Sequence, residues 1–192
     1  MNDGRRARGD LTRRTAARRA AMVATVSGLD AITVGGLAAD TGLSKSGILT
    51  VFPNREAIQL AAVAEARRIY VETVIRPAWG LPAGRERLRG LLDSWVDYVR
   101  AETFPGGCFL TTSSVEFGHR DGAVADAVRA LKREWLDLLE GELRTAGADD
   151  PEEDAFRIDA FLTAAVTRLQ LLGDDSCLDR ARRLAEGVIS GH

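Results

Sequence analysis

The sequence is poor in the residues that most often build catalytic, metal-binding and disulfide-linked proteins. Its 192 residues include two histidines, two cysteines and five prolines, and aromatic residues make up 6%. Cys108 and Cys177 stand apart, without the paired Cys or Cys/His spacing of a zinc site, so we expect both to be reduced thiols. No Ser/His/Asp or Cys/His set, Gly-rich phosphate loop or paired-carboxylate motif stands out. We therefore expect no enzyme, no cofactor and no metal.

Long hydrophobic runs are also missing. No apolar segment approaches the ~18 residues needed to span a membrane. The arginines near the start of the chain are not followed by the hydrophobic segment of a signal peptide. We therefore expect a cytoplasmic protein that has no membrane partner.

Charge is distributed unevenly along the chain. Residues 1–57 hold nine Lys and Arg against five Asp and Glu, a net charge of +4, whereas the remainder holds 17 against 23, a net charge of −6. The overall net charge of −2 hides this difference. A basic end and an acidic body are typical of a protein that meets a polyanion at one end only.

The composition favours an all-α fold. Hydrophobic residues make up 45%, and long stretches contain neither glycine nor proline. We expect a first helix over 11–27, after a polar, glycine-containing segment, 1–10, with no structure of its own. Apolar residues recur at helical spacing over 85–102 and 123–146.

Start signals locate the other long helices. Asn54 can cap a helix that runs to about Ile75 and ends at Pro77. Asp150 followed by Pro151 predicts another, which runs to about residue 172. The run from Ser176 to Asp179 resembles a capping box for the last helix. We see no strands or repeats.

The stretch from 33 to 56 predicts a pair of short helices. Thr33 can cap the first helix, and Gly42 follows it where a left-handed residue is needed. Ser44 can cap a second helix over 44–52, which Pro53 stops. Two short helices joined by a tight, glycine-containing turn describe a helix-turn-helix, whose second helix enters the major groove of DNA.

These capping, turn and hydrophobic residues agree with a known pattern at many positions at once. The matching residues are Gly28, Thr33-Val34, Leu37-Ala38, Gly42-Leu43-Ser44-Lys45, Phe52 and Arg55-Glu56. From about residue 10 to 60 the chain resembles the DNA-binding segment of TetR-family transcriptional regulators. The resemblance implies an N-terminal three-helix DNA-binding domain over 1–53, with a basic arm. A helical-bundle domain for effector binding and dimerisation would occupy 54–192.

The candidate DNA-binding residues lie in and around the second short helix. Lys45 can approach a phosphate or a guanine edge, and Thr50 and Val51 can contact a thymine methyl group. Family positions that contact phosphate match Thr33 and Arg55. The full set is Thr33, Ser44, Lys45, Ser46, Gly47, Leu49, Thr50, Val51, Asn54 and Arg55.

Two features of this region have more than one interpretation. Leu49, Thr50 and Val51 stand where the family usually carries aromatic residues or histidine, so family base contacts do not carry over to them. The arginines at 5, 6 and 8 form either a solvated tail or an arm along the DNA. The alternative for the whole segment is a small helical surface with ordinary polar residues, but the agreement of the full pattern favours DNA binding.

The last two helices predict a dimer interface. Residues 155–172 show one apolar face and a second face of small, weakly polar residues, which suggests a partner beyond the helix's own core. The resemblance implies a four-helix interface with a second copy; the alternative is that both faces are satisfied within the monomer. Candidate interface residues are Ala160, Thr163, Ala164, Thr167, Leu171, Leu178, Ala181 and Ala185.

The segment 108–117 combines small hydroxyls with two aromatic residues and one charge. With side chains of neighbouring helices it could line an apolar effector cavity, although aromatic residues at helical spacing also suit an ordinary core. The resemblance favours the cavity, because members commonly bind a small effector in the body. Candidate lining residues are Trp95, Tyr98, Val99, Cys108, Phe109, Thr112, Phe117, Trp135 and Phe161. Glu116, His119 and Asp121 could meet at a metal, but an ordinary polar turn explains them better.

We therefore predict a ligand-responsive DNA-binding transcriptional regulator. It would be a homodimeric repressor, released from a palindromic double-stranded DNA operator by a small, largely apolar effector. The alternatives are a DNA-binding dimer without an effector, and a helical lipid or small-molecule carrier whose head no longer binds DNA.

Overall fold

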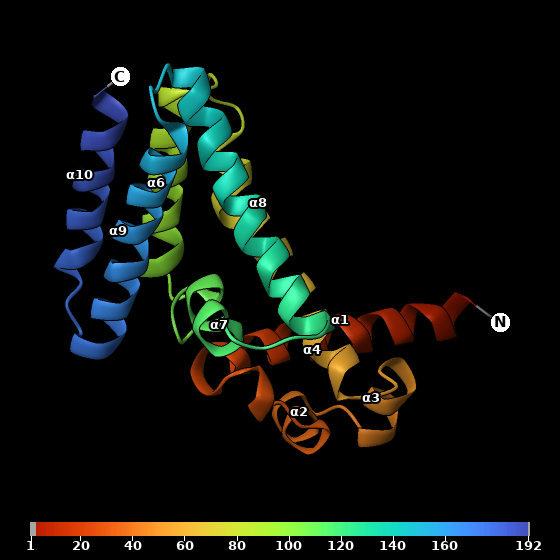
Figure 1. Ribbon diagram of the computed structural model, residues 1–192. Coiled ribbons are helices and arrows are strands. Elements are labelled where there is room, and N and C mark those ends of the chain that lie inside the picture. Colours follow the sequence, from red (N-terminus) through yellow and green to blue (C-terminus); the bar gives the residue numbers. More distant parts are fainter. Residues whose placement is uncertain (1–2, 192) are drawn as a thin grey trace. The chain divides into compact units, whose positions relative to one another are not determined.

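The computed structural model describes the backbone of residues 3–191 and the side chains of residues 6–191. Every regular element in that part of the chain is a helix (Figure 1), so the predicted all-α fold is confirmed. The chain divides into two compact units. Unit 1 comprises 1–68 and 104–129, and unit 2 comprises 69–103 and 130–192. Over the described residues, no helix is both long enough and apolar enough to cross a membrane.

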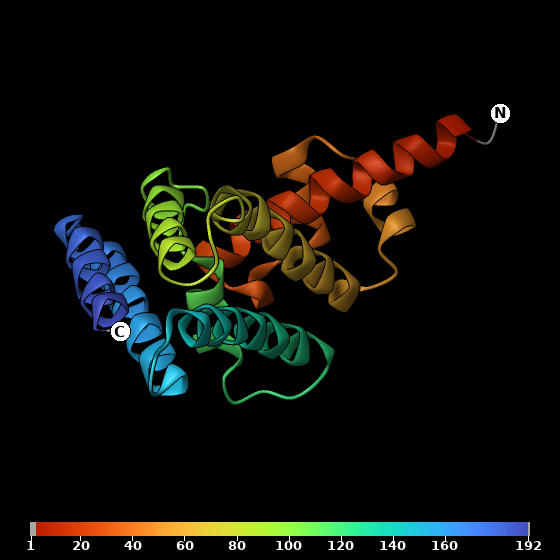
Figure 2. The ribbon, with the colours of Figure 1, turned by 90° about the horizontal axis from the view of Figure 1, so that it is seen from above.

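Unit 1 is built on the long helix α1, against which the short helices α2 and α3 pack (Figures 1 and 2). Small alanine side chains on its inner face let its neighbours approach closely, and all are at most 5% exposed: Ala16, Ala17, Ala20, Ala21 and Ala24. The elements of this unit are α1 (Asp3–Ser27), η1 (Leu29–Ala31), α2 (Val34–Thr41), α3 (Lys45–Val51), most of α4 (Arg55–Tyr70), α7 (Phe109–Phe117) and the start of α8 (Ala123–Ala146).

Helix α1 is longer than the sequence predicted. It begins at Asp3 rather than at Leu11, and the Arg8 Nε donates a hydrogen bond of 3.2 Å to the Gly4 carbonyl. Extending an existing helix costs far less than nucleating one, and alanine and arginine are good helix formers. The polar composition of this segment therefore did not prevent it from joining the helix.

The core of the helix-turn-helix is small and apolar. Its largest fully buried side chains are Leu29, Ile32, Leu37, Ile48 and Phe52. Arg13 of α1 ties the end of α3 to this core: its Nη1 donates to the Val51 carbonyl at 2.9 Å, and its guanidinium lies 4.9 Å from the centre of the Phe52 ring. The position of α3 is therefore set by α1 as well as by the turn that precedes it.

Unit 2 is a bundle in which α9 lies beside α10, and α6 lies beside α10 (Figure 1). Ion pairs join α6 to α10, among them Arg89 with Glu186 at 2.7 Å and Arg100 with Asp179 at 2.9 Å. Its elements are η2, a π-helical turn (Val71–Ile75), α5 (Arg76–Ala78), α6 (Arg85–Arg100), the rest of α8, α9 (Pro151–Leu172) and α10 (Ser176–Ser190).

Most of the predicted helix ends are confirmed, and one more needs correction. Helix α9 begins at Pro151, and Asp150 Oδ1 accepts from the Glu153 N–H at 3.1 Å. The helix that begins after Asn54 continues without a break through η2 and α5 and ends at Ala78, one residue past Pro77. Ser176 does not cap α10, because it is already the first helical residue and its hydroxyl contacts Asp174 Oδ1 at 2.5 Å.

Candidate DNA-binding site

Three side-chain caps and one glycine define the helix-turn-helix. Thr33 Oγ1 accepts from the Gly36 N–H at 3.0 Å, and Ser44 Oγ accepts from the Gly47 N–H at 3.0 Å. Gly42 ends α2 in the left-handed conformation, with φ of 71°. Asn54 Oδ1 accepts from the Ala57 N–H at 2.8 Å and so caps α4. All four of these local signals, predicted from the sequence, are present, and they define the helix ends on both sides of the turn between α2 and α3.

One face of α3 is open to solvent. At about 100° per residue its exposed side chains form a continuous arc, made of Lys45, Ser46, Leu49 and Thr50. Ile48 points inward and is fully buried, whereas Gly47 and Val51 are half-buried at the edge of the arc. The major groove of DNA, about 12 Å wide, admits a single helix presented in this way.

Lys45 leans back toward the start of α2. A methyl group added at Gly35 would lie 3.8 Å from Lys45 Cε and 3.9 Å from its Nζ. The ammonium group therefore stands beside the first turn of α2, whose backbone N–H groups carry partial positive charge. The Lys45 ammonium group and these N–H groups together favour an anion such as a DNA phosphate more than a base edge.

Asp30 organises the start of α4, where the predicted phosphate contact Arg55 lies. Arg55 Nη2 is 3.6 Å from Asp30 Oδ1, and Arg120 Nη1 bonds the other carboxylate oxygen. The hydrogen bond from Arg120, together with the charges of Arg120 and Arg55, lowers the pKa of Asp30. Gln59 Nε2 donates to Asp30 Oδ1 at 3.2 Å. The anionic Asp30 therefore holds the Arg55 guanidinium near the N-terminus of α4. About half of the Arg55 side chain remains exposed.

Glu116 of α7 holds the turn between α1 and α2. Its Oε2 accepts from the Leu29 N–H at 2.8 Å and its Oε1 from the Asp30 N–H at 3.1 Å. Its carboxylate thus caps η1, a role that no residue near η1 in the sequence fills. The polar-turn interpretation of Glu116, His119 and Asp121 missed this contact, because partners 86 and 87 positions apart leave no local signal. Over the described residues, no three metal-binding side chains gather.

A second contact seats the segment before α7 on the last turn of α1. The Gly106 N–H donates to Thr25 Oγ1 at 3.2 Å, and a Cβ at Gly106 would lie 1.8 Å from the Thr25 carbonyl oxygen. No residue larger than glycine fits here without movement of the backbone. Residues 104–117 therefore belong structurally to the same unit as the helix-turn-helix.

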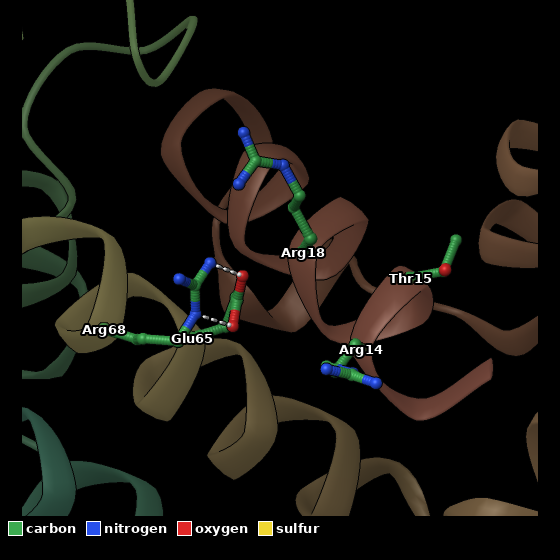
Figure 3. A pocket seen from close by; sticks show the side chains of 5 residues that line it. All are labelled: Arg14, Thr15, Arg18, Glu65 and Arg68. Carbon is green, nitrogen blue, oxygen red and sulfur yellow. Dashed lines mark hydrogen bonds and ion pairs between the residues drawn. The ribbon is translucent and has the colours of Figure 1, made fainter. Parts of the chain in front are cut away.

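Basic side chains also surround a shallow depression between α1 and α4 (Figure 3). It has a volume of about 370 Å³ and is lined by Arg14, Thr15, Arg18, Glu65 and Arg68. Arg68 forms two hydrogen bonds with Glu65, of 2.9 and 2.7 Å. Arg14 and Arg18 add two positive charges that this carboxylate does not offset, and they contribute to the positive field of the unit.

The structure distributes the predicted interface residues over different environments. Ala160, Ala164, Thr167 and Leu171 of α9 are exposed, Leu171 at 78%, and Thr163 is half-buried. Phe156, 67% exposed on the same face, extends this surface by a turn. Three residues of α10 pack inside the single chain and are at most 3% exposed: Leu178, Ala181 and Ala185. On α10, the large apolar side chain that remains exposed is Leu184, with 48% of its surface accessible to solvent.

The nine predicted effector residues are divided between the units. Cys108, Phe109, Thr112 and Phe117 belong to unit 1, and Trp95, Tyr98, Val99, Trp135 and Phe161 to unit 2. All are buried except Thr112 and Phe161, which are half-buried. Within unit 2 the Tyr70 ring meets Tyr98 and Trp135 edge to face, at 5.5 and 5.6 Å. The effector pocket itself stays a prediction.

Comparison with known proteins identifies the family. Residues 84–185 match the family model described as Tetracyclin repressor-like, C-terminal domain. The chain belongs to the TetR family. The resemblance found in the N-terminal segment is therefore confirmed by a match to the other part of the chain, and this TetR-family protein is a transcription regulator rather than an enzyme. No curated protein matches it closely enough to count as a relative.

Solved structures share the whole fold. A TetR regulator from Chloroflexus aurantiacus superposes with a TM-score of 0.86 at 24% identity, over 95% of this chain and 96% of its own. A regulator from Saccharomonospora viridis in complex with choline superposes with a TM-score of 0.76 at 19% identity, over 94% of this chain and 96% of its own. AibR, in complex with isovaleryl coenzyme A and operator DNA, superposes with a TM-score of 0.65 at 19% identity, over 96% of this chain and 97% of its own.

Proposed function

We propose that this TetR-family regulator is a homodimeric repressor, which binds a palindromic operator and is released by a small, largely apolar effector. The observation that carries the proposal is the exposed arc of α3, held by its caps and by Arg13, with Lys45 and Arg55 flanking it. We place its action in the cytoplasm, on the cell's own DNA. Residues 1–53 would form the DNA-binding domain and 54–192 the effector-binding and dimerisation domain.

The small size of one recognition helix supports the dimer. A single helix buries too little surface for useful specificity, whereas two related by a two-fold axis can read adjacent major grooves ~34–36 Å apart. The exposed face of α9 offers a surface for such pairing. Its residues recur at helical spacing over four turns, from Phe156 through Ala160 and Thr167 to Leu171.

The effector part of the proposal is supported by two similar proteins and by one side chain. Structural neighbours hold choline in one case and isovaleryl coenzyme A with operator DNA in the other. In this chain, Ser114 Oγ is buried in α7 and makes no hydrogen bond to any residue that the structure describes. A buried hydroxyl is costly to leave unpaired, so a polar group of a ligand would be well placed to satisfy it.

Release by an effector requires coupling between the two binding events. The effector must bind better to a conformation whose recognition helices are wrongly spaced for DNA, and α4, which continues from the helix-turn-helix into the body, would transmit the change. Because coupling is reciprocal, operator DNA must weaken effector binding by the same factor. Independent binding of the two would contradict this mechanism.

Selection of DNA from a random duplex library by the purified protein tests the proposal. We expect enrichment of one palindromic sequence, bound with a strong dependence on salt and more weakly by Lys45→Ala. This duplex then serves as the probe in a screen for apolar molecules that release it. A selected duplex that no such molecule releases would favour a regulator without an effector. No enrichment, together with tight binding of an apolar molecule, would favour a carrier.

A further inference from the structure

The polar side chains of the recognition surface are largely engaged within α3 itself. Thr50 Oγ1 donates to the Ser46 carbonyl at 2.8 Å. Ser44 Oγ, which accepts from the Gly47 N–H, also shares a hydrogen bond of 3.3 Å with Ser46 Oγ. Since a hydroxyl has a single proton to donate, the Thr50 hydroxyl has no donor left for a base.

Lys45 is also poorly placed to read bases at the centre of this surface. Its ammonium group lies beside Gly35 at the start of α2, where a phosphate is the natural partner. Val51 is half-buried, and its carbonyl is bonded by Arg13. At about 100° per residue, Leu49 and Ser46 occupy the middle of the exposed arc, and Lys45 and Thr50 lie at its edges. The largest apolar group there is the Leu49 side chain, 53% exposed, and the Thr50 side chain adds a methyl group on the far side of Ser46.

An isolated exposed leucine is common on protein surfaces and needs no special explanation. Here, however, Leu49 lies between Lys45 and Ser46 on the surface that the proposed function places against DNA. Base edges in the major groove offer one kind of apolar group, the methyl at C5 of thymine. 5-Methylcytosine carries the same methyl group at the same place. Leu49 has no hydrogen-bonding group, so it would leave a polar base edge desolvated without a partner.

We propose that this protein reads pyrimidine C5-methyl groups in the major groove, through Leu49 and the methyl group of Thr50. The inference rests on the proposed DNA-binding function and deepens it, since it names the chemical feature recognised. Each half of the operator would contain a thymine opposite Leu49, and affinity there would follow the methyl group rather than the hydrogen-bonding pattern of the base pair. Lys45 and Arg55 would add affinity that is uniform over sequences.

The test exchanges single bases in the selected operator. At each thymine of a half-site, duplexes carrying thymine, uracil, cytosine or 5-methylcytosine are titrated with wild-type protein. Removing a contacted methyl group should weaken binding about 4- to 10-fold, the effect of one buried methyl or methylene group. The ratio of 5-methylcytosine to cytosine affinity at that position should match the ratio of thymine to uracil.

The Leu49→Ala variant assigns the effect to a side chain. At one position of the half-site, the variant should bind the thymine and uracil duplexes with equal affinity. At the other positions it should keep the wild-type ratio of the two affinities. Val26→Ala, which removes atoms from a side chain 65% exposed at the end of α1, is the matched control and should change no ratio. Circular dichroism should show native helicity for both, because both side chains are exposed.

The possible outcomes separate the inference from the function beneath it. If no duplex is enriched in the selection, the proposed DNA binding itself fails. If a duplex binds tightly but uracil replaces thymine at every position without loss, or if Leu49→Ala keeps every ratio, then methyl recognition by Leu49 is wrong and the DNA-binding function stands.

Discussion

At the scale of single residues, the helix-turn-helix depends on side chains that satisfy backbone N–H groups. Thr33, Ser44 and Asn54 do so for their own helices, within three residues. Glu116 does so for η1 from a distant part of the chain. Local caps set the shape of the turn between α2 and α3, whereas Glu116 ties the turn between α1 and α2 to α7.

Removing the Glu116 carboxylate should therefore loosen the turn between α1 and α2. We expect Glu116→Ala to lower the free energy of unfolding by about 1–3 kcal/mol, because two backbone donors lose a charged acceptor. Glu116→Gln, which retains one acceptor oxygen, should lose less. Hydrogen exchange at the Leu29 and Asp30 amides should speed up in both variants, and Glu140→Ala on α8 serves as the control. Unchanged exchange at these two amides would contradict the capping role.

Asp30 gives a pH dependence with a definite sign. Its pKa is lowered in the folded protein, chiefly by the hydrogen bond from Arg120, so its contribution to stability is present above the ordinary value of 3.8 and lost as the pH falls through the lower folded value. The side chain is 52% exposed, so after screening by solvent the contribution is less than about 1 kcal/mol. Asp30→Asn should unfold more easily than wild type at pH 7, measured in urea, and the difference should shrink below pH 3.8 and in high salt. A constant difference would contradict this electrostatic role.

At the scale of elements, the segment before α7 is seated on α1 through glycine. Gly106→Ala would place a methyl group 1.8 Å from the Thr25 carbonyl oxygen, so the segment must move. We expect a loss of more than about 2 kcal/mol in the free energy of unfolding. Gly141→Ala is the matched control: nothing lies within 4 Å of its Cβ in α8, and we expect it to stabilise the protein by about 0.5–1 kcal/mol. Equal effects of both substitutions on the melting temperature would show that the close contact is absent.

The sequence predicted elements best where local chemistry decides them. Thr33, Gly42 and Ser44 define the short helices through contacts only a few residues long, and Asp150 with Pro151 does the same for α9. The prediction failed at residues 3–10, since tail composition does not show that a neighbouring helix can propagate through it. The contacts of Asp30, Arg120 and Glu116 could not be predicted, because they depend on how α7 folds back on the turn after α1.

At the scale of the whole molecule, the proposed dimer depends on one exposed face of α9. The α9 side chains Phe156 and Leu171 expose 67% and 78% of their surface in the single chain. We expect the double variant Phe156→Glu with Leu171→Glu to be monomeric in sedimentation analysis and to lose binding to a palindromic duplex. Its helicity should be native, since neither side chain packs in the core.

The matched control for the dimer is Val26→Glu, which introduces a carboxylate at an exposed position of α1. This variant should sediment as a dimer, like the wild type. A wild-type protein that sediments as a monomer at micromolar concentration, or a double variant that stays dimeric, would rule out this face as the interface.

The measurement that tests the central claim most directly is the salt dependence of binding to the selected duplex. Wild type, Lys45→Ala and Arg133→Ala, an exposed arginine of α8, would be titrated at several salt concentrations. We expect a steep loss of affinity with salt for wild type, and a slope of log K against log salt that is smaller by about 1 per protomer for Lys45→Ala. Arg133→Ala should match wild type. Weak binding with the same slope for all three proteins would contradict recognition of DNA through α3.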